Sequence, residues 1–123
     1  MTASTDAPRR YDLIDIGNER RSIYCGTDWA LTVPYTDDAG APIPITAPRM
    51  QVRRHGYSTA DLILAMGVTT VANVATVTLT ATQTTAVTAD HGFYDLFATR
   101  TDTNAEVKLL YGRVVFVAMI SAP

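Results

Sequence analysis

Histidine, cysteine and carboxylate side chains build most catalytic and metal sites, and this sequence offers few of them at a useful spacing. Its two histidines, His55 and His91, lie far apart, and each stands beside a glycine in a stretch typical of a turn. We interpret both as surface loop residues rather than metal ligands. Cys25 is the only cysteine, which excludes an internal disulfide, and we expect it to behave as a small buried apolar residue.

The carboxylates fit structural roles better than acid–base catalysis. Asp37 and Asp38 fall inside the turn TDDAG, where aspartate hydrogen-bonds its own backbone, and the run lacks the alternating oxygen ligands of a calcium loop. Asp90 precedes a His-Gly turn, and Asp95 lies within FYDLF, where burial would require an amide or arginine partner. The sequence also lacks a glycine-rich phosphate loop and a serine elbow. We therefore predict no enzymatic activity, including hydrolase activity, and no metal or cofactor.

Arginine is the residue type whose spacing stands out, because it occurs in adjacent pairs: Arg9 with Arg10, Arg20 with Arg21, and Arg53 with Arg54. The pairs indicate either solvated surface charge or contacts with an acidic neighbouring subunit, which the planar five-donor guanidinium suits. The formal net charge of -2 and the pI of about 5.5 argue against a nucleic-acid partner, for which a domain pI above roughly 9 is typical.

The elements that position these residues belong to one small domain. A chain of 123 residues can bury a single core, and 47% hydrophobic residues predict a folded chain. Charged residues make up 18%, below the roughly 25% of average soluble domains, which favours a surface partly covered by neighbours. We see no signal-peptide pattern and no apolar run approaching the roughly 18 residues of a membrane span. We therefore expect a protein of the reducing cytoplasm.

Threonine and valine, which favour strands, are frequent, and in several short runs apolar and polar residues alternate with a period of two. Clusters of Gly, Pro, Asp and Asn separate these runs, which predicts an all-β sandwich or barrel. The clearest strand spans residues 28–36. Further strands are expected over 49–54, over 67–80 with a hairpin turn at Asn73, and over 92–100 and 107–120. The residues expected to form the core framework are Trp29, Leu31, Val33, Val52, Val77, Leu79 and Leu96.

Three segments leave alternatives open. Residues 55–67 fit either a short helical turn or a loop followed by a strand, and residues 80–87 fit either a connector or a single helical turn between sheets. The closing strand, with a bend expected at Gly112, is apolar on both faces from residue 114 onward. That pattern indicates either cover on both sides or a subunit interface, because the outer face of an antiparallel sandwich is normally polar.

The order of several motifs resembles the small β-sandwich module of tailed-bacteriophage structural proteins, found at the N-terminus of baseplate upper proteins and in short stand-alone virion proteins. The motifs are DAGAP at residues 38–42, MQVR at 50–53, the connector TVTLTATQTTAV, YDL at 94–96 and KLLYGRV at 108–114. The resemblance covers about residues 26–120. The chain departs from the family at PIPIT, where a turn similar to Asp-Leu-Thr-Gly is usual.

The resemblance implies an antiparallel Ig-like β-sandwich over residues 26–123. It does not explain residues 1–25, which we expect to form an extended N-terminal arm or lead-in strand that docks onto a neighbour. The resemblance implies a non-enzymatic tail, baseplate or neck protein of the virion, synthesised in the host cytoplasm. Its partners would be other virion proteins and further copies of itself, with no nucleic acid and no membrane. The alternatives are a capsid decoration protein and a carbohydrate- or ligand-binding adhesion module, which a single tryptophan supports poorly.

In the leading reading, the arm and the apolar closing strand bury surface against neighbours, and the arginine pairs set the register by charge complementarity. The candidate interface residues are Arg9, Arg10, Tyr11, Arg20, Arg21, Arg53, Arg54, Val115, Val117 and Met119.

Overall fold

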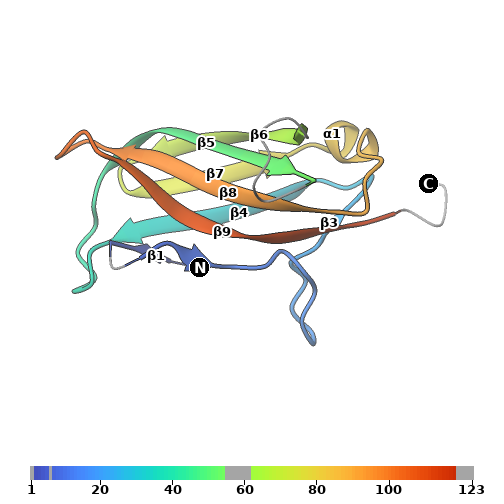
Figure 1. The fold of residues 1–123 in the computed structure, drawn as a ribbon, viewed down its shortest axis with the longest axis horizontal. Helices are drawn as coiled ribbons and strands as arrows, with labels where there is room; N and C mark the ends of the chain where they lie inside the picture. The colour runs from blue at the N-terminus through green and yellow to red at the C-terminus, as the bar shows by residue number, and fades with distance from the viewer. Residues whose placement is uncertain (1, 6, 55–61, 119–123) are drawn as a thin grey trace.

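The computed structural model describes residues 2–5, 7–54 and 62–118, which form an all-β fold with a short helix (Figure 1). The elements are β1 (Ala3–Ser4), β2 (Arg9–Arg10), β3 (Ile23–Tyr24), β4 (Trp29–Thr36), β5 (Ile45–Arg53), β6 (Leu62–Val71), β7 (Val74–Leu79), α1 (Ala81–Thr85), β8 (His91–Arg100) and β9 (Glu106–Val117). In this described part of the chain, no helix has the length and apolar character needed to cross a membrane.

Strands β4 to β9 form an antiparallel sheet in the order β4-β7-β6-β5-β8-β9, which curls into a nearly closed barrel. Strand β6 connects the two halves of the curved sheet, because it changes its pairing partner along its length. Its first half pairs with β5, and from Gly67 onward it pairs with β7. In Figure 1, β5 and β6 lie along one long side of the molecule, and β4 and β9 lie along the opposite side.

The N-terminal segment lies between β4 and β9 and nearly closes the barrel. β1 pairs in parallel with β4, whereas β2 and β3 pair in parallel with β9. Between β2 and β3, the Leu13 amide donates to the Arg113 carbonyl oxygen at 2.8 Å. Ala3, Leu13 and Ile23 are at most 1% exposed. The segment that we expected as an arm or lead-in strand therefore contributes to the barrel wall and to the core.

Gly112 allows this segment to lie close to β9. A Cβ atom at this position would stand 2.8 Å from the Tyr11 carbonyl oxygen and 2.8 Å from Asp12 Oδ1, nearer than real Cβ contacts come. Strand β9 runs through the glycine without a break. The glycine thus serves the close approach of a neighbouring backbone, which is one of the reasons for glycine within a strand.

The alternation read from the sequence corresponds to the burial seen in the long strands. In β4 the residues on the parity of Trp29 point inward, and in β7 Val77 and Leu79 are buried while Thr78 is exposed. Of the seven residues expected in the core framework, Trp29 and Leu31 are half-buried and pack against the core. The other five are at most 2% exposed: Val33, Val52, Val77, Leu79 and Leu96.

A β-bulge in β9 interrupts the alternation. Leu96 of β8 is opposite Leu110, but the next residue, Phe97, is opposite Lys108, so Leu109 is the extra residue. Leu109 and Leu110 are both fully buried. The bulge therefore places two successive leucines in the core and puts Lys108 and Tyr111, three residues apart, on the same outer side.

The structure decides the open alternatives where it describes them. Residues 62–71 are strand, so a helical turn there is wrong, while residues 55–61 lie outside the described residues. The single helical turn is confirmed as α1, which Thr80 caps by accepting from the Gln83 amide at 3.2 Å. The hairpin turn is confirmed at Ala72 and Asn73, between the paired residues Val71 and Val74.

Candidate functional site

The outer side of β5, β8 and β9 carries cations and aromatic rings in register. Directly paired residues of neighbouring antiparallel strands share one side of the sheet. The register therefore gives three rows across the strands, which we call the basic face: Arg49, Phe97 and Lys108; Gln51, Asp95 and Tyr111; and Arg53, Phe93 and Arg113. Strand β2 extends the middle row, because Arg10 is paired with Tyr111.

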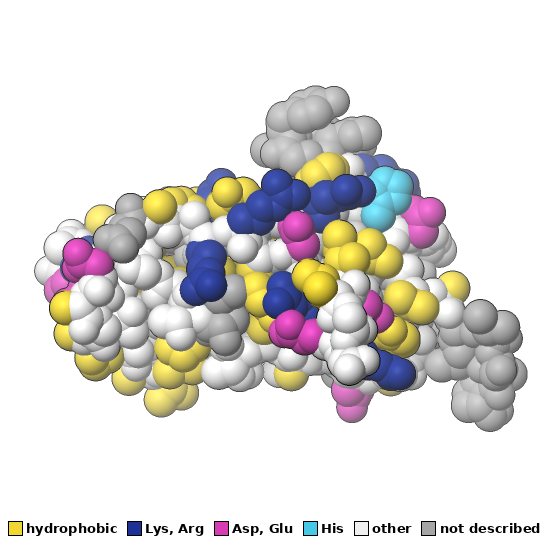
Figure 2. Space-filling view, turned by 90° about the horizontal axis from the view of Figure 1, so that it is seen from below, with side chains coloured by type: hydrophobic (Ala, Val, Ile, Leu, Met, Phe, Trp, Pro, Cys, Tyr) yellow, Lys and Arg dark blue, Asp and Glu magenta, His cyan; other side chains and the backbone are white. Residues whose placement is uncertain are grey.

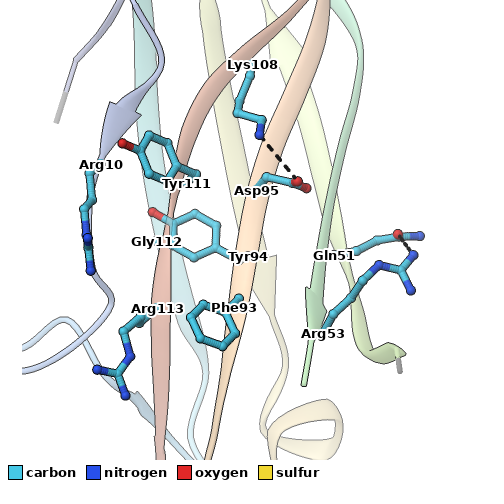
Figure 3. A pocket seen from close by; sticks show the side chains of 10 residues that line it. All are labelled: Arg10, Gln51, Arg53, Phe93, Tyr94, Asp95, Lys108, Tyr111, Gly112 and Arg113. Atoms are coloured by element: carbon cyan, nitrogen blue, oxygen red, sulfur yellow. Dashed lines mark hydrogen bonds and ion pairs between the residues drawn. The ribbon is translucent and has the colours of Figure 1, made fainter. Parts of the chain in front are cut away.

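A shallow hollow of about 280 Å³ lies on this face. Figure 3 shows Arg10 and Arg113 on one side of the hollow, Arg53 with Gln51 on the other, and the Phe93 ring between them. The remaining lining residues are Tyr94, Asp95, Lys108, Tyr111 and Gly112. The hollow thus combines several guanidinium groups with an aromatic floor.

Cations stack on the rings at one end of the basic face. The Arg49 guanidinium carbon is 4.8 Å and the Lys108 ammonium 5.3 Å from the centre of the Phe97 ring, both within cation–π range. Arg49 also forms an ion pair with Glu106. Lys108 Nζ lies 4.0 Å from Asp95 Oδ2. These exposed pairs hold the long side chains over the sheet but contribute little to stability.

Asp12 connects the basic face to the N-terminal segment. Its Oδ1 accepts the Arg113 backbone N–H at 3.0 Å and lies 3.2 Å from Arg10 Nε. Burial opposes ionisation of this carboxyl, but the Arg113 amide and the Arg10 guanidinium outweigh burial and hold its pKa below the usual 3.8. Asp12 therefore fixes Arg10 beside the hollow.

A second cluster of expected interface residues lies on the loop between β2 and β3 and on β3 itself. The Asp15 carboxylate accepts from the backbone amides of Arg21 and Ser22 and from the Tyr24 hydroxyl. Arg20 stacks on the Tyr24 ring at 5.2 Å. The Tyr24 and amide hydrogen bonds lower the pKa of Asp15, so the carboxylate is a structural acceptor that shapes the loop.

The remaining residues singled out from the sequence are scattered. Arg9 and Arg54 are exposed, Tyr11 lies under the Arg21 guanidinium at 4.3 Å, and Val115 and Val117 are half-buried on β9. Met119 and His55 lie outside the described residues. The structure therefore brings Arg10 and Arg53 together from different arginine pairs, and leaves the other pair members apart from them.

Sequence reasoning missed most of the basic face. It singled out neither the rings Phe93 and Phe97 nor the cations Lys108 and Arg113. Alternation over residues 92–100 does place Phe93, Asp95 and Phe97 on one side, and that signal was available. Their cationic neighbours depend on the register with β5 and on the bulge in β9.

The residues considered for catalysis have local partners. His91 Nδ1 lies 2.7 Å from Asp90 Oδ1, and this hydrogen bond lowers the pKa of Asp90. Asp37 Oδ1 accepts from the amides of Ala39 and Ala41 inside its turn. Cys25 is half-buried against the core. Within the described ranges, no group of three or more His, Cys, Asp or Glu residues is arranged to hold a metal ion.

Comparison with known proteins gives no relative from which to infer a function: no family model matches the chain, and no curated protein matches it.

Proposed function

We propose that this chain is a non-enzymatic structural component of a tailed-bacteriophage virion, in its tail, baseplate or neck. In this proposal, symmetry-related copies dock onto other virion proteins through the basic face. The observation that carries the proposal is the register of aromatic and cationic side chains across β5, β8 and β9.

The composition of the basic face supports docking. Arginine and aromatic residues are enriched where proteins bind each other, and tyrosine and arginine are frequent hot spots. Tyr111 is 39% exposed, and Phe93 and Phe97 are half-buried on the outer side of the sheet. Figure 2, viewed from below Figure 1, shows Lys and Arg side chains concentrated over part of the surface among hydrophobic and acidic ones. A sheet face that meets only water needs no such rings.

The motifs behind the phage resemblance coincide with this face. MQVR contributes Gln51 and Arg53, YDL contributes Asp95, and KLLYGRV contributes Lys108, Tyr111 and Arg113. The same KLLYGRV segment supplies the β9 bulge and the glycine against which the N-terminal segment packs. The motifs thus contribute both scaffold and surface, as a shared docking module would require.

We also propose that the barrel is an Ig-like sandwich of the kind found in that module. One layer consists of β4, β7 and the second half of β6. The other consists of the first half of β6 with β5, β8 and β9. The N-terminal segment then lies along the open side between the layers.

Quantitative mass spectrometry of purified particles tests this function. An epitope-tagged chain is produced in a host infected with the phage that encodes it, and particles are banded by density. We expect the chain in intact particles, in a small multiple of three or six copies. Hundreds of copies would instead identify a capsid decoration protein. Absence of the chain from the particles would contradict the proposal.

A further inference from the structure

The row of Arg53, Phe93 and Arg113 has the chemistry of a receptor for a carboxylate. Both arginines are paired directly with Phe93 on either side of it, so their backbones stand about 10 Å apart, two strand spacings. A guanidinium presents two parallel N–H donors that match the two oxygens of a carboxylate. An acidic side chain entering over Phe93 would therefore meet donors from both directions.

Arg113 is the cation with the most capacity for a new partner. Within the described residues its guanidinium has no ion pair and donates no hydrogen bond, and Asp12 accepts only its backbone N–H. Three other cations of this surface already have acidic partners: Arg10 with Asp12, Arg49 with Glu106 and Lys108 with Asp95. Arg53 donates a hydrogen bond to Gln51 Oε1 on the opposite side of the hollow from Arg113.

We propose that the hollow binds an acidic segment of a neighbouring protein. One carboxylate lies between Arg113 and Arg53, and the adjoining apolar atoms of the segment pack against Phe93 and Tyr111. This inference rests on the proposed function, because it names the chemistry of the partner that docks on the basic face.

The charges around the hollow favour a protein segment over a nucleic acid. Asp95 stands in the middle row of the basic face, and Asp12 and Glu106 stand at its margins. A nucleic acid brings an unbroken series of phosphates, which these carboxylates would repel. The chain as a whole carries a net charge of -2, which also opposes a polyanion. A peptide instead carries separated carboxylates with neutral residues between them.

Titration of the ¹⁵N-labelled full chain, followed by NMR, tests the inference. The probes are a short peptide of glutamates separated by glycine and serine, the same peptide with glutamine in place of glutamate, and oligothymidylate. We expect the glutamate peptide to shift the amides of Phe93 and Arg113 and to bind more weakly as salt is added. Arg113→Glu and Arg53→Glu should each weaken binding by about fivefold or more.

Arg20→Glu is the matched control. It changes the net charge equally, but Arg20 stacks on Tyr24 and does not line the hollow, so the variant should leave the affinity almost unchanged. Arg113→Lys keeps the positive charge but loses the two parallel N–H donors of the guanidinium, so this variant should bind the glutamate peptide with an intermediate affinity. The dispersion of each variant's amide spectrum reports whether it is folded.

Equal binding of the glutamine peptide, or no effect of Arg113→Glu in a folded variant, would overturn the inference. So would tighter binding of oligothymidylate. If the chain is present in virions but does not bind the glutamate peptide, the proposed function stands and only the acidic partner segment is ruled out. If the chain binds the glutamate peptide but is missing from virions, the proposed function is contradicted instead.

Discussion

The molecule presents two outer sheet faces that share a scaffold and differ in chemistry. On the basic face, each row across β5, β8 and β9 contains at least one ring and one charge. On the other side, β4, β7 and the second half of β6 form what we call the threonine face. Its rows are Ala30, Thr78 and Gly67; Thr32, Thr76 and Thr69; and, beside the hairpin turn, Pro34, Val74 and Val71.

The difference shows which residues the fold itself requires. Threonine suits a pleated surface with water on one side, because its branched side chain is stiff and its hydroxyl is solvated. The threonine face holds its strands in register without aromatic rings or charges. The basic face has the same pleat and pairing, so its rings and guanidinium groups are not needed to form a sheet. We therefore interpret them as contacts with another molecule.

Both faces depend on the nearly closed barrel, and truncating the Leu13 side chain, which packs the N-terminal segment into the core, should have the largest effect on stability. Leu13 is 1% exposed, so Leu13→Ala should lower the free energy of unfolding by about 2–5 kcal/mol. Urea unfolding measures the loss. Ile16→Ala is the control, because Ile16 is 55% exposed and should cost at most about 0.5 kcal/mol. Equal costs for the two variants would show that the segment is not packed as described.

Glycine substitutions test whether the basic face needs the N-terminal segment beside it. Gly112→Ala places a Cβ 2.8 Å from the Tyr11 carbonyl oxygen and should cost about 1–3 kcal/mol while displacing Arg10 from the hollow. Gly67→Ala, on the threonine face, is the matched control, because its nearest neighbour would be the Thr78 carbonyl oxygen at 3.6 Å. Thermal unfolding should separate the two variants. If Gly112→Ala does not lower the melting temperature, the close approach of the Tyr11 backbone to β9 is contradicted.

Charge substitutions on the two faces compare their roles directly. The pair Arg53→Glu with Arg113→Glu should reduce incorporation of the chain into particles by about tenfold or more, because two donors become repulsive. The pair Thr76→Glu with Thr78→Glu should incorporate normally. Arg9→Glu with Arg20→Glu matches the total change in charge. Quantification of the tagged chain in purified particles measures all three, and equal loss in every double variant would remove the distinction between the faces.

The smallest expected effect concerns pH and the edge of the basic face. The pKa of Asp12 is lowered in the folded chain, so ionised Asp12 stabilises the fold at pH values above 3.8, and this contribution is lost as the pH falls through the lowered pKa. Asp12→Asn should therefore cost under about 1 kcal/mol near neutral pH. The difference from the unchanged chain should shrink on acidification. Urea unfolding across that pH range measures it, and a difference that grows on acidification would contradict the assignment.

Local patterns in the sequence predicted much of the fold. Alternation identified β4, β5 and β7 and their core residues, because the period of two depends only on neighbouring residues. The run over residues 80–87 allowed a connector or a single helical turn, and the latter is α1. The closure of the barrel depends instead on contacts distant in sequence, such as the pairing of Leu13 with Val114. No local period reports such a contact, so the sequence predicted residues 1–25 only as an arm or a lead-in strand and not as part of the barrel wall.

The candidate site was predictable only in part. Adjacent arginines drew attention to Arg10 and Arg53, but adjacency on a strand places neighbours on opposite sides of the sheet. What unites Arg10, Arg53 and Arg113 is the register across four strands, and the one-residue shift of the β9 bulge adds Lys108 to the same side. Without that shift, Lys108 and Tyr111 would lie on opposite sides of β9.

Photocrosslinking inside the assembled particle tests the central claim most directly. A photoreactive phenylalanine analogue is introduced at Tyr111 on the basic face or at Thr78 on the threonine face, and the crosslinked products are identified by mass spectrometry. We predict that the probe at Tyr111 is joined to another virion protein, at a segment containing aspartate or glutamate, while the probe at Thr78 yields no such product. Crosslinks from Thr78 alone would show that the chain docks through the opposite face and would contradict the account.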